Sequence, residues 1–132
     1  MPTITEDYVS FEIAKLLKEK GFNEACMYYY PDSHTQLISY MDCKQSDMFG
    51  PEACIAPTLQ MAMKWLREVH NIIISPYALS LGYYFEIFDL TNRDITGCKP
   101  LYLVGIPNKE EVLNTYEKAC DVAIKYCLEN LI

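Results

Sequence analysis

The chain has 132 residues and a mass of 15.3 kDa, with 51% hydrophobic and 22% charged residues. This composition is typical of a globular protein and excludes a disordered chain or a fibrous repeat. Eighteen acidic and eleven basic residues give a net charge of −7, and such a surface repels the phosphates of nucleic acids. We therefore expect no nucleic-acid binding, and at this length we expect a single domain over residues 1–132.

The sequence carries no recognised signal for a metal, a cofactor or a membrane. No CxxC pair, GxGxxG, Walker lysine or HExxH motif is present, and only His34 and His70 offer imidazole ligands. The first residues lack a basic segment followed by an apolar one, and no apolar stretch approaches the ~20 residues of a membrane span. Reduced thiols in the cytoplasm are therefore predicted for all the cysteines, at positions 26, 43, 54, 98, 120 and 127.

Three amphipathic helices are predicted, from Ser10 to Gly21, from Pro57 to Asn71 and from Thr115 to Asn130. Ser10 and Thr115 are the expected N-caps, because their hydroxyls can accept a hydrogen bond from an amide of the first turn. Pro57 suits a first helical position, where its missing N–H costs nothing. Gly21 and Asn71 suit the left-handed conformation that ends a helix.

Five strands are predicted from aromatic and β-branched side chains, at 25–30, 36–41, 72–77, 83–90 and 101–106. Short connections rich in turn-forming residues favour antiparallel pairing. Residues 43–55 lose all periodicity and are predicted to form a surface loop, whereas residues 108–114 are ambiguous. The order α-β-β-α-β-β-β-α predicts an α+β fold, with three helices on one face of a mainly antiparallel sheet of about five strands.

Tyrosine is the distinctive residue type of this chain. Eleven tyrosines are present, including consecutive ones at 28–30 and 83–84, and neighbours in a strand point to opposite faces. A rigid apolar ring with a polar tip suits a binding surface, although tyrosine also fits an exposed strand without any partner. On the face that the helices leave uncovered, the candidate binding residues are Tyr28, Tyr30, Tyr84 and Glu86.

The sequence predicts no catalytic residue. His70 with Cys54 or Cys120 is the conceivable nucleophile–base pair. However, His70 ends a predicted helix, where a positive charge favours the terminal carbonyls. Cys120 and Cys127 lie seven residues apart on an apolar helix face, which is typical of buried structural thiols.

Three segments of the predicted helices carry a resemblance to known proteins: YVSFEIAKLLKEKGF at 8–22, APTLQMAMKWLREVH at 56–70, and TYEKA at 115–119 with AIKYCLENL at 123–131. With these segments, roughly a third of its length, the chain resembles a family of short uncharacterised proteins from gut Bacteroides-type bacteria, their phages and their mobile elements. That family has no assigned activity, so no residue inherits a role. The resemblance implies a bacterial cytoplasmic setting and a mobile-element origin.

Two functions are compatible with these observations. The first is a small non-enzymatic interaction module that binds another protein, more easily a basic one, or a second copy of itself as a homodimer. The alternative is a small enzyme or ligand-binding domain with a pocket beside the 43–55 loop. Such a pocket would need converging polar groups, such as His34, His70, Glu86 or Cys54.

Overall fold

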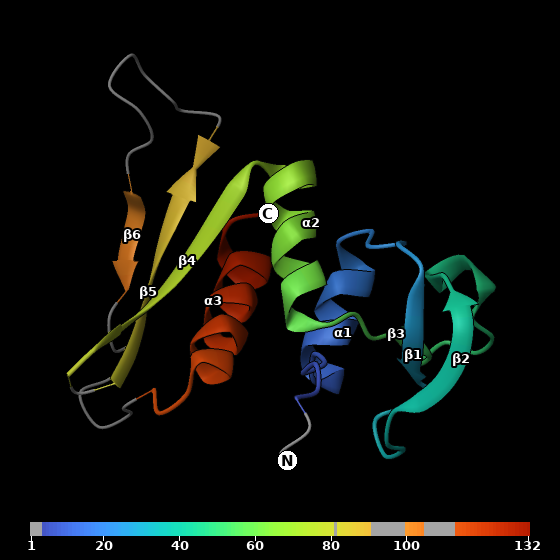
Figure 1. Ribbon diagram of the computed structural model, residues 1–132. Coiled ribbons are helices and arrows are strands. Elements are labelled where there is room, and N and C mark those ends of the chain that lie inside the picture. The colour runs from blue at the N-terminus through green and yellow to red at the C-terminus, as the bar shows by residue number, and fades with distance from the viewer. Residues whose placement is uncertain (1–3, 81, 91–99, 105–112) are drawn as a thin grey trace. The chain divides into compact units, whose positions relative to one another are not determined.

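In the computed structural model, the protein divides into two compact units (Figure 1). Unit 1 comprises Met1–Ala62 with Leu128–Ile132, and unit 2 comprises Met63–Cys127. The structure describes residues 4–80, 82–90, 100–104 and 113–132. Helices alternate with antiparallel strands, which confirms the predicted α+β class and the approximate order of the elements.

The strands form two three-stranded sheets rather than the one sheet that the sequence predicts. Unit 1 holds the order β2-β1-β3, and unit 2 holds the order β4-β5-β6. A short turn between two strands indicates that they pair with each other. The 12-residue helix α2 separates β3 from β4, so no turn in the sequence indicates whether these two strands belong to the same sheet. The strands are β1 (Cys26–Tyr30), β2 (Ile38–Cys43), β3 (Cys54–Ile55), β4 (Ile72–Leu79), β5 (Gly82–Asp89) and β6 (Pro100–Val104).

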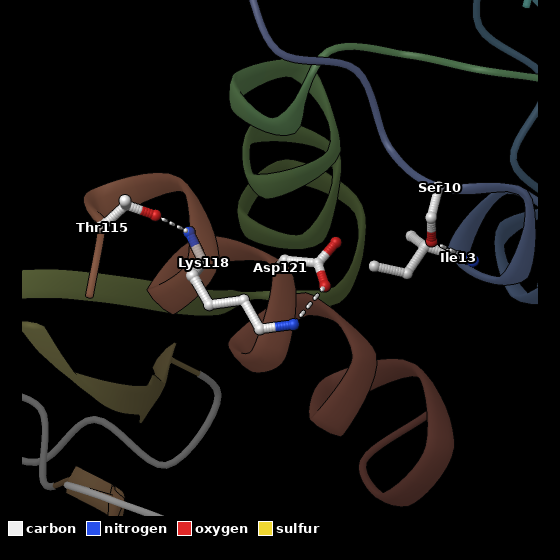
Figure 2. A network of polar contacts seen from close by, with 5 residues as sticks. All are labelled: Ser10, Ile13, Thr115, Lys118 and Asp121. Atoms are coloured by element: carbon white, nitrogen blue, oxygen red, sulfur yellow. Dashed lines mark hydrogen bonds and ion pairs between the residues drawn. The ribbon is translucent and has the colours of Figure 1, made fainter. Parts of the chain in front are cut away.

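The helix termini follow the predicted capping chemistry. Helix α1 (Phe11–Glu19) begins after Ser10, whose Oγ accepts a hydrogen bond from the Ile13 N–H at 3.3 Å (Figure 2). Gly21, with φ of 89°, follows the end of α1 in the left-handed region that glycine adopts most easily. Helix α3 (Tyr116–Asn130) begins after Thr115, whose Oγ1 accepts from the Lys118 N–H at 3.0 Å.

Helix α2 (Leu59–His70) begins two residues later than the sequence predicts. Thr58, not a residue before Pro57, is the cap, because its Oγ1 accepts from the Met61 N–H at 3.0 Å. Pro57 lies outside the helix, and its carbonyl accepts a hydrogen bond from the Val9 N–H at 3.0 Å. At the other end, Asn71 adopts the predicted left-handed conformation with φ of 58°.

The segment 43–55 is more ordered than the predicted surface loop. It contains the short 3-10 helix η1 (Gln45–Asp47) and the strand β3, which pairs antiparallel with β1. Ala53, Cys54 and Ile55 are buried. An apolar run of this length gives no periodic signal, so its pairing with β1 could not be inferred from the pattern. Of the ambiguous segment 108–114, only the last two residues lie within the described structure, and Leu113 is buried.

Unit 2 packs α3 against its sheet. Phe85 and Ile87 on β5 and Cys120 on α3 are fully buried. The Tyr83 ring meets the Tyr116 ring edge-on at 6.5 Å, and the Tyr83 N–H donates to the Leu113 carbonyl at 2.9 Å. No helix in the described part of the chain is long and apolar enough to cross a membrane.

We expect Thr115→Ala to lower the free energy of unfolding by about 1 kcal/mol, because an amide of the first turn of α3 loses its acceptor. Urea unfolding followed by circular dichroism measures the change. Thr115→Ser is the matched control, because it keeps the hydroxyl and should retain most of the stability. Equal losses in both variants would show that the cap does not stabilise α3.

Candidate functional site

Strand β1 presents its three tyrosines to opposite faces of the unit 1 sheet. The Tyr30 hydroxyl donates to the Val9 carbonyl at 2.7 Å, and the Tyr30 ring meets Phe11 edge-on at 5.8 Å. The Tyr28 ring lies 4.6 Å from the Tyr8 ring. Both side chains are half-buried against the segment that leads into α1. The predicted open face therefore does not carry these two candidates, since alternation alone does not reveal which face another segment covers.

Tyr29 occupies the opposite face, which the sequence analysis did not single out. It is the cross-strand partner of Ile38, and directly opposed residues in a ladder share a face. Tyr40, two residues further along β2, meets the Tyr29 ring edge-on at 6.0 Å. The Tyr40 side chain remains 56% exposed. An aromatic pair is thus available on the solvent side of this sheet.

The segment between η1 and β3 extends this aromatic pair into a larger surface. Met48 and Phe49 join Tyr29 and Tyr40 around a pocket of about 230 Å³. Phe49 is 94% exposed, which is unusual for so large an apolar side chain. We call this surface the apolar patch, and it consists of Tyr29, Ile38, Tyr40, Met48 and Phe49.

A bulge in β2 shapes one side of the patch. Cys26 pairs with Cys43, but Tyr28 pairs with Ser39, so β2 carries two more residues than β1 over this interval. Within this bulge, Asp42 has a φ of 45°. This is a left-handed conformation, which aspartate adopts more readily than most residues. Such a bulge bends the strand and redirects its side chains. Met41, within the bulge, is 81% exposed.

The two edge strands of the unit 1 sheet differ in whether their outward backbone groups are hydrogen-bonded. At β3, the Gln45 side chain accepts from the Ile55 N–H at 3.1 Å and donates to the Ala53 carbonyl at 2.8 Å. Its amide thus satisfies the backbone groups that a fourth strand would use. At β2, five of the six residues are exposed, and no described strand pairs with its outer side. The edge of β2 therefore offers unpaired backbone groups directly beside the apolar patch.

Most of the negative charge belongs to this unit. Its sequence contains ten acidic and four basic residues, a net charge of −6 out of −7 for the chain. Asp47 lines the pocket, and Asp32 follows Pro31 of its wall. Hydrogen bonds from the Thr35 hydroxyl and from the His34 N–H lower the pKa of Asp32, so it remains ionised at neutral pH. The apolar patch therefore lies in an acidic environment.

The other two candidates, Tyr84 and Glu86, belong to unit 2. Tyr84 stacks on its cross-strand partner Tyr77 with ring centroids 5.9 Å apart, and Glu86 lies opposite Ser75. Both candidates are half-buried, on the face opposite Phe85. The four predicted binding residues are thus divided between two units, and their role in binding stays a prediction.

Burial suppresses the ionisation of the described cysteines. All five are buried free thiols, and burial raises the pKa of each. For Cys54 this effect outweighs Lys18 and Lys15, which favour the thiolate. The sixth cysteine, Cys98, lies outside the described residues. A raised pKa disfavours the thiolate that nucleophilic attack requires.

Of the four polar groups expected in a ligand pocket, Cys54 alone lines one of the two pockets that adjoin the 43–55 segment. A second pocket of about 410 Å³ is lined by Phe11, Lys15, Lys18, Glu19, Ser33, Pro51, Glu52 and Cys54. The Lys18 ammonium donates to the carbonyls of Pro51 and Ala53, so it is already engaged. His34, His70 and Glu86 line neither pocket. Within the described ranges, no three His, Cys, Asp or Glu side chains are grouped to hold a metal ion.

No protein-family model, curated protein or solved structure matches this chain.

We expect the stability of the protein to fall as the pH rises above about 9, because burial raises the pKa of Cys127 from 9.0 to about 12. A thiol with a higher pKa in the folded state stabilises the fold fully below its unfolded pKa, and this contribution is lost as the pH rises toward the folded pKa. Urea midpoints measured with reductant between about pH 8 and about pH 10.5 test this.

The control is Cys127→Ala, which removes the titrating group. It should be about 1–2 kcal/mol less stable at pH 8 but should lose less stability at higher pH. Parallel pH profiles for the two proteins would contradict a role of this thiol.

Proposed function

We propose that this chain is a protein-interaction module, and that unit 1 binds an extended, basic and apolar segment of another protein along the outer edge of β2. The observation that carries the proposal is the unpaired edge of β2 beside the apolar patch. An added strand forms main-chain hydrogen bonds with such an edge, and every second side chain reaches one face of the sheet.

The size of the patch pocket favours a side chain over a small molecule. Pockets for drug-sized ligands usually enclose about 300–1,000 Å³. The pocket beside Tyr29 and Phe49 encloses about 230 Å³ and has a mainly apolar lining. It therefore suits one large apolar side chain from a strand that lies along β2.

The negative charge of unit 1 favours a basic partner. A net charge of −6 attracts a basic segment and accelerates its association at low ionic strength. The same charge opposes the approach of a second copy, which would bring an equal negative charge to the interface. We therefore assign the patch to a basic partner rather than to a homodimer.

The five described free thiols support a reducing compartment, such as the cytoplasm, as the place where binding occurs.

The test uses a library of extended peptides that alternate apolar and basic residues, with peptides carrying Glu in place of the basic residues as controls. We expect the basic peptides to bind and Phe49→Ser to weaken binding at least about tenfold, as is typical of a central aromatic anchor. Phe49 is almost fully exposed, so the variant should fold normally. Val69→Ser is the matched control, because Val69 is 54% exposed but lies on α2 outside the patch.

Strand addition has a second signature. Methylation of alternate backbone nitrogens of the peptide should abolish binding in one of the two alternations and spare it in the other. Binding of the acidic peptides, or equal weakening by Val69→Ser, would overturn the proposal. A concentration-dependent dimer that Phe49→Ser dissociates would also overturn it, because a second copy would then occupy the patch.

A further inference from the structure

Cys26 and Cys43 lie directly opposite each other at the end of the β1–β2 ladder. Opposed residues of antiparallel strands have Cα atoms about 4.5–5.5 Å apart, within the range that a disulfide spans. The Cys43 thiol donates to the Cys26 carbonyl at 3.3 Å, so it is directed at the partner strand. We propose that Cys26 and Cys43 form a reversible cross-strand disulfide when a low-molecular-weight disulfide, such as oxidised glutathione, is present.

The other described cysteines lack such a partner. Cys54 on β3 lies opposite Tyr30. Cys120 and Cys127 are seven residues apart on α3, which separates them by about 10 Å along the helix axis. That separation exceeds the reach of a disulfide. The geometry therefore selects one pair among the described thiols.

The local backbone permits the small movement that bond formation requires. Opposed Cβ atoms in a ladder are about 4.5–5.5 Å apart, whereas those of a disulfide are about 3.5–4.5 Å apart. The bulge of β2 follows Cys43 directly along the ladder, and β2 is an exposed edge strand. An edge strand at a bulge adjusts more easily than a central strand, because fewer contacts hold it.

The reaction is a thiol–disulfide exchange in two steps. Cys26 lines a pocket of about 150 Å³ and is 6% exposed whereas Cys43 is fully buried, so we assign the first attack to Cys26. The Cys26 thiolate attacks one sulfur of the small disulfide, forms a mixed disulfide and releases one small thiolate. The Cys43 thiolate then attacks the Cys26 sulfur and releases the second small thiolate. The two thiolates take up the two protons that the cysteines gave up, so two thiols are oxidised and one disulfide is reduced.

The bond would close the hairpin that carries much of the apolar patch. Residues 26 and 43 enclose Tyr29, Ile38 and Tyr40, so oxidation links both strands beneath the proposed docking surface. Because burial raises the pKa of Cys26 to about 12, we expect the exchange to be slow at neutral pH. This proposal concerns a modification of the chain and stands whether or not a partner binds the patch.

The test incubates the folded protein with oxidised glutathione and maps its disulfides by mass spectrometry. Trypsin leaves both cysteines in one peptide, residues 21–44, so a second cleavage after the tyrosines is needed to show the link. We expect a Cys26–Cys43 link that Cys26→Ser and Cys43→Ser each abolish. Cys54→Ser, which removes a buried thiol of the same sheet, is the matched control and should leave the link unchanged.

A second measurement does not depend on the folding of these variants. The equilibrium constant for forming the link, measured in glutathione buffers, should be at least about tenfold larger in the folded protein than in urea, because the ladder holds the thiols together. Glutathione that remains on Cys26, a link to another cysteine, or no oxidation at all would overturn the proposal. Equal equilibrium constants in the folded and the unfolded chain would also overturn it.

Discussion

The hydrogen bond from the Tyr30 hydroxyl to the Val9 carbonyl ties the central strand of unit 1 to the segment that leads into α1. Because strand side chains alternate, this contact directs Tyr30 and Tyr28 to the covered face and leaves Tyr29 on the other. The pairing of Tyr29 with Ile38 and its ring contact with Tyr40 then place the apolar patch. The orientation of one strand therefore decides which tyrosine of β1 joins the apolar patch.

The unit 1 sheet combines this open face with one closed and one open edge. Gln45 completes the hydrogen bonding of β3, so that side of the sheet cannot accept another strand. The edge of β2 has no equivalent cover among the described residues, and its bulge brings Met41 into solvent. Exposed apolar edges promote association, and proteins usually protect them. Our proposal of a bound partner rests on this open edge, which lies beside an apolar pocket in a unit of net charge −6.

Local chemistry was predictable where neighbouring residues determine it. Ser10 and Thr115 act as caps, and Gly21 and Asn71 adopt left-handed conformations, because each role depends on only a few adjacent residues. Predictions that depend on distant residues were less accurate. The strand β3 was not predicted, because two residues, Cys54 and Ile55, are too few to show a periodic pattern. These residues form a strand through their pairing with β1. The covered face of β1 was missed because Val9 lies 21 residues from Tyr30.

The amino-acid sequence by itself determined the α+β class, the caps of α1 and α3, the burial of Cys120 and Cys127 and the acidic balance, because composition, capping and periodicity are local or additive properties. Only the tertiary structure decided that the strands form two sheets, that Tyr29 rather than Tyr28 or Tyr30 contacts Tyr40, and that Gln45 closes one edge. It also placed Cys26 opposite Cys43. These features arise from contacts between residues far apart in the chain, and the periodicity of a single strand cannot encode what packs against it.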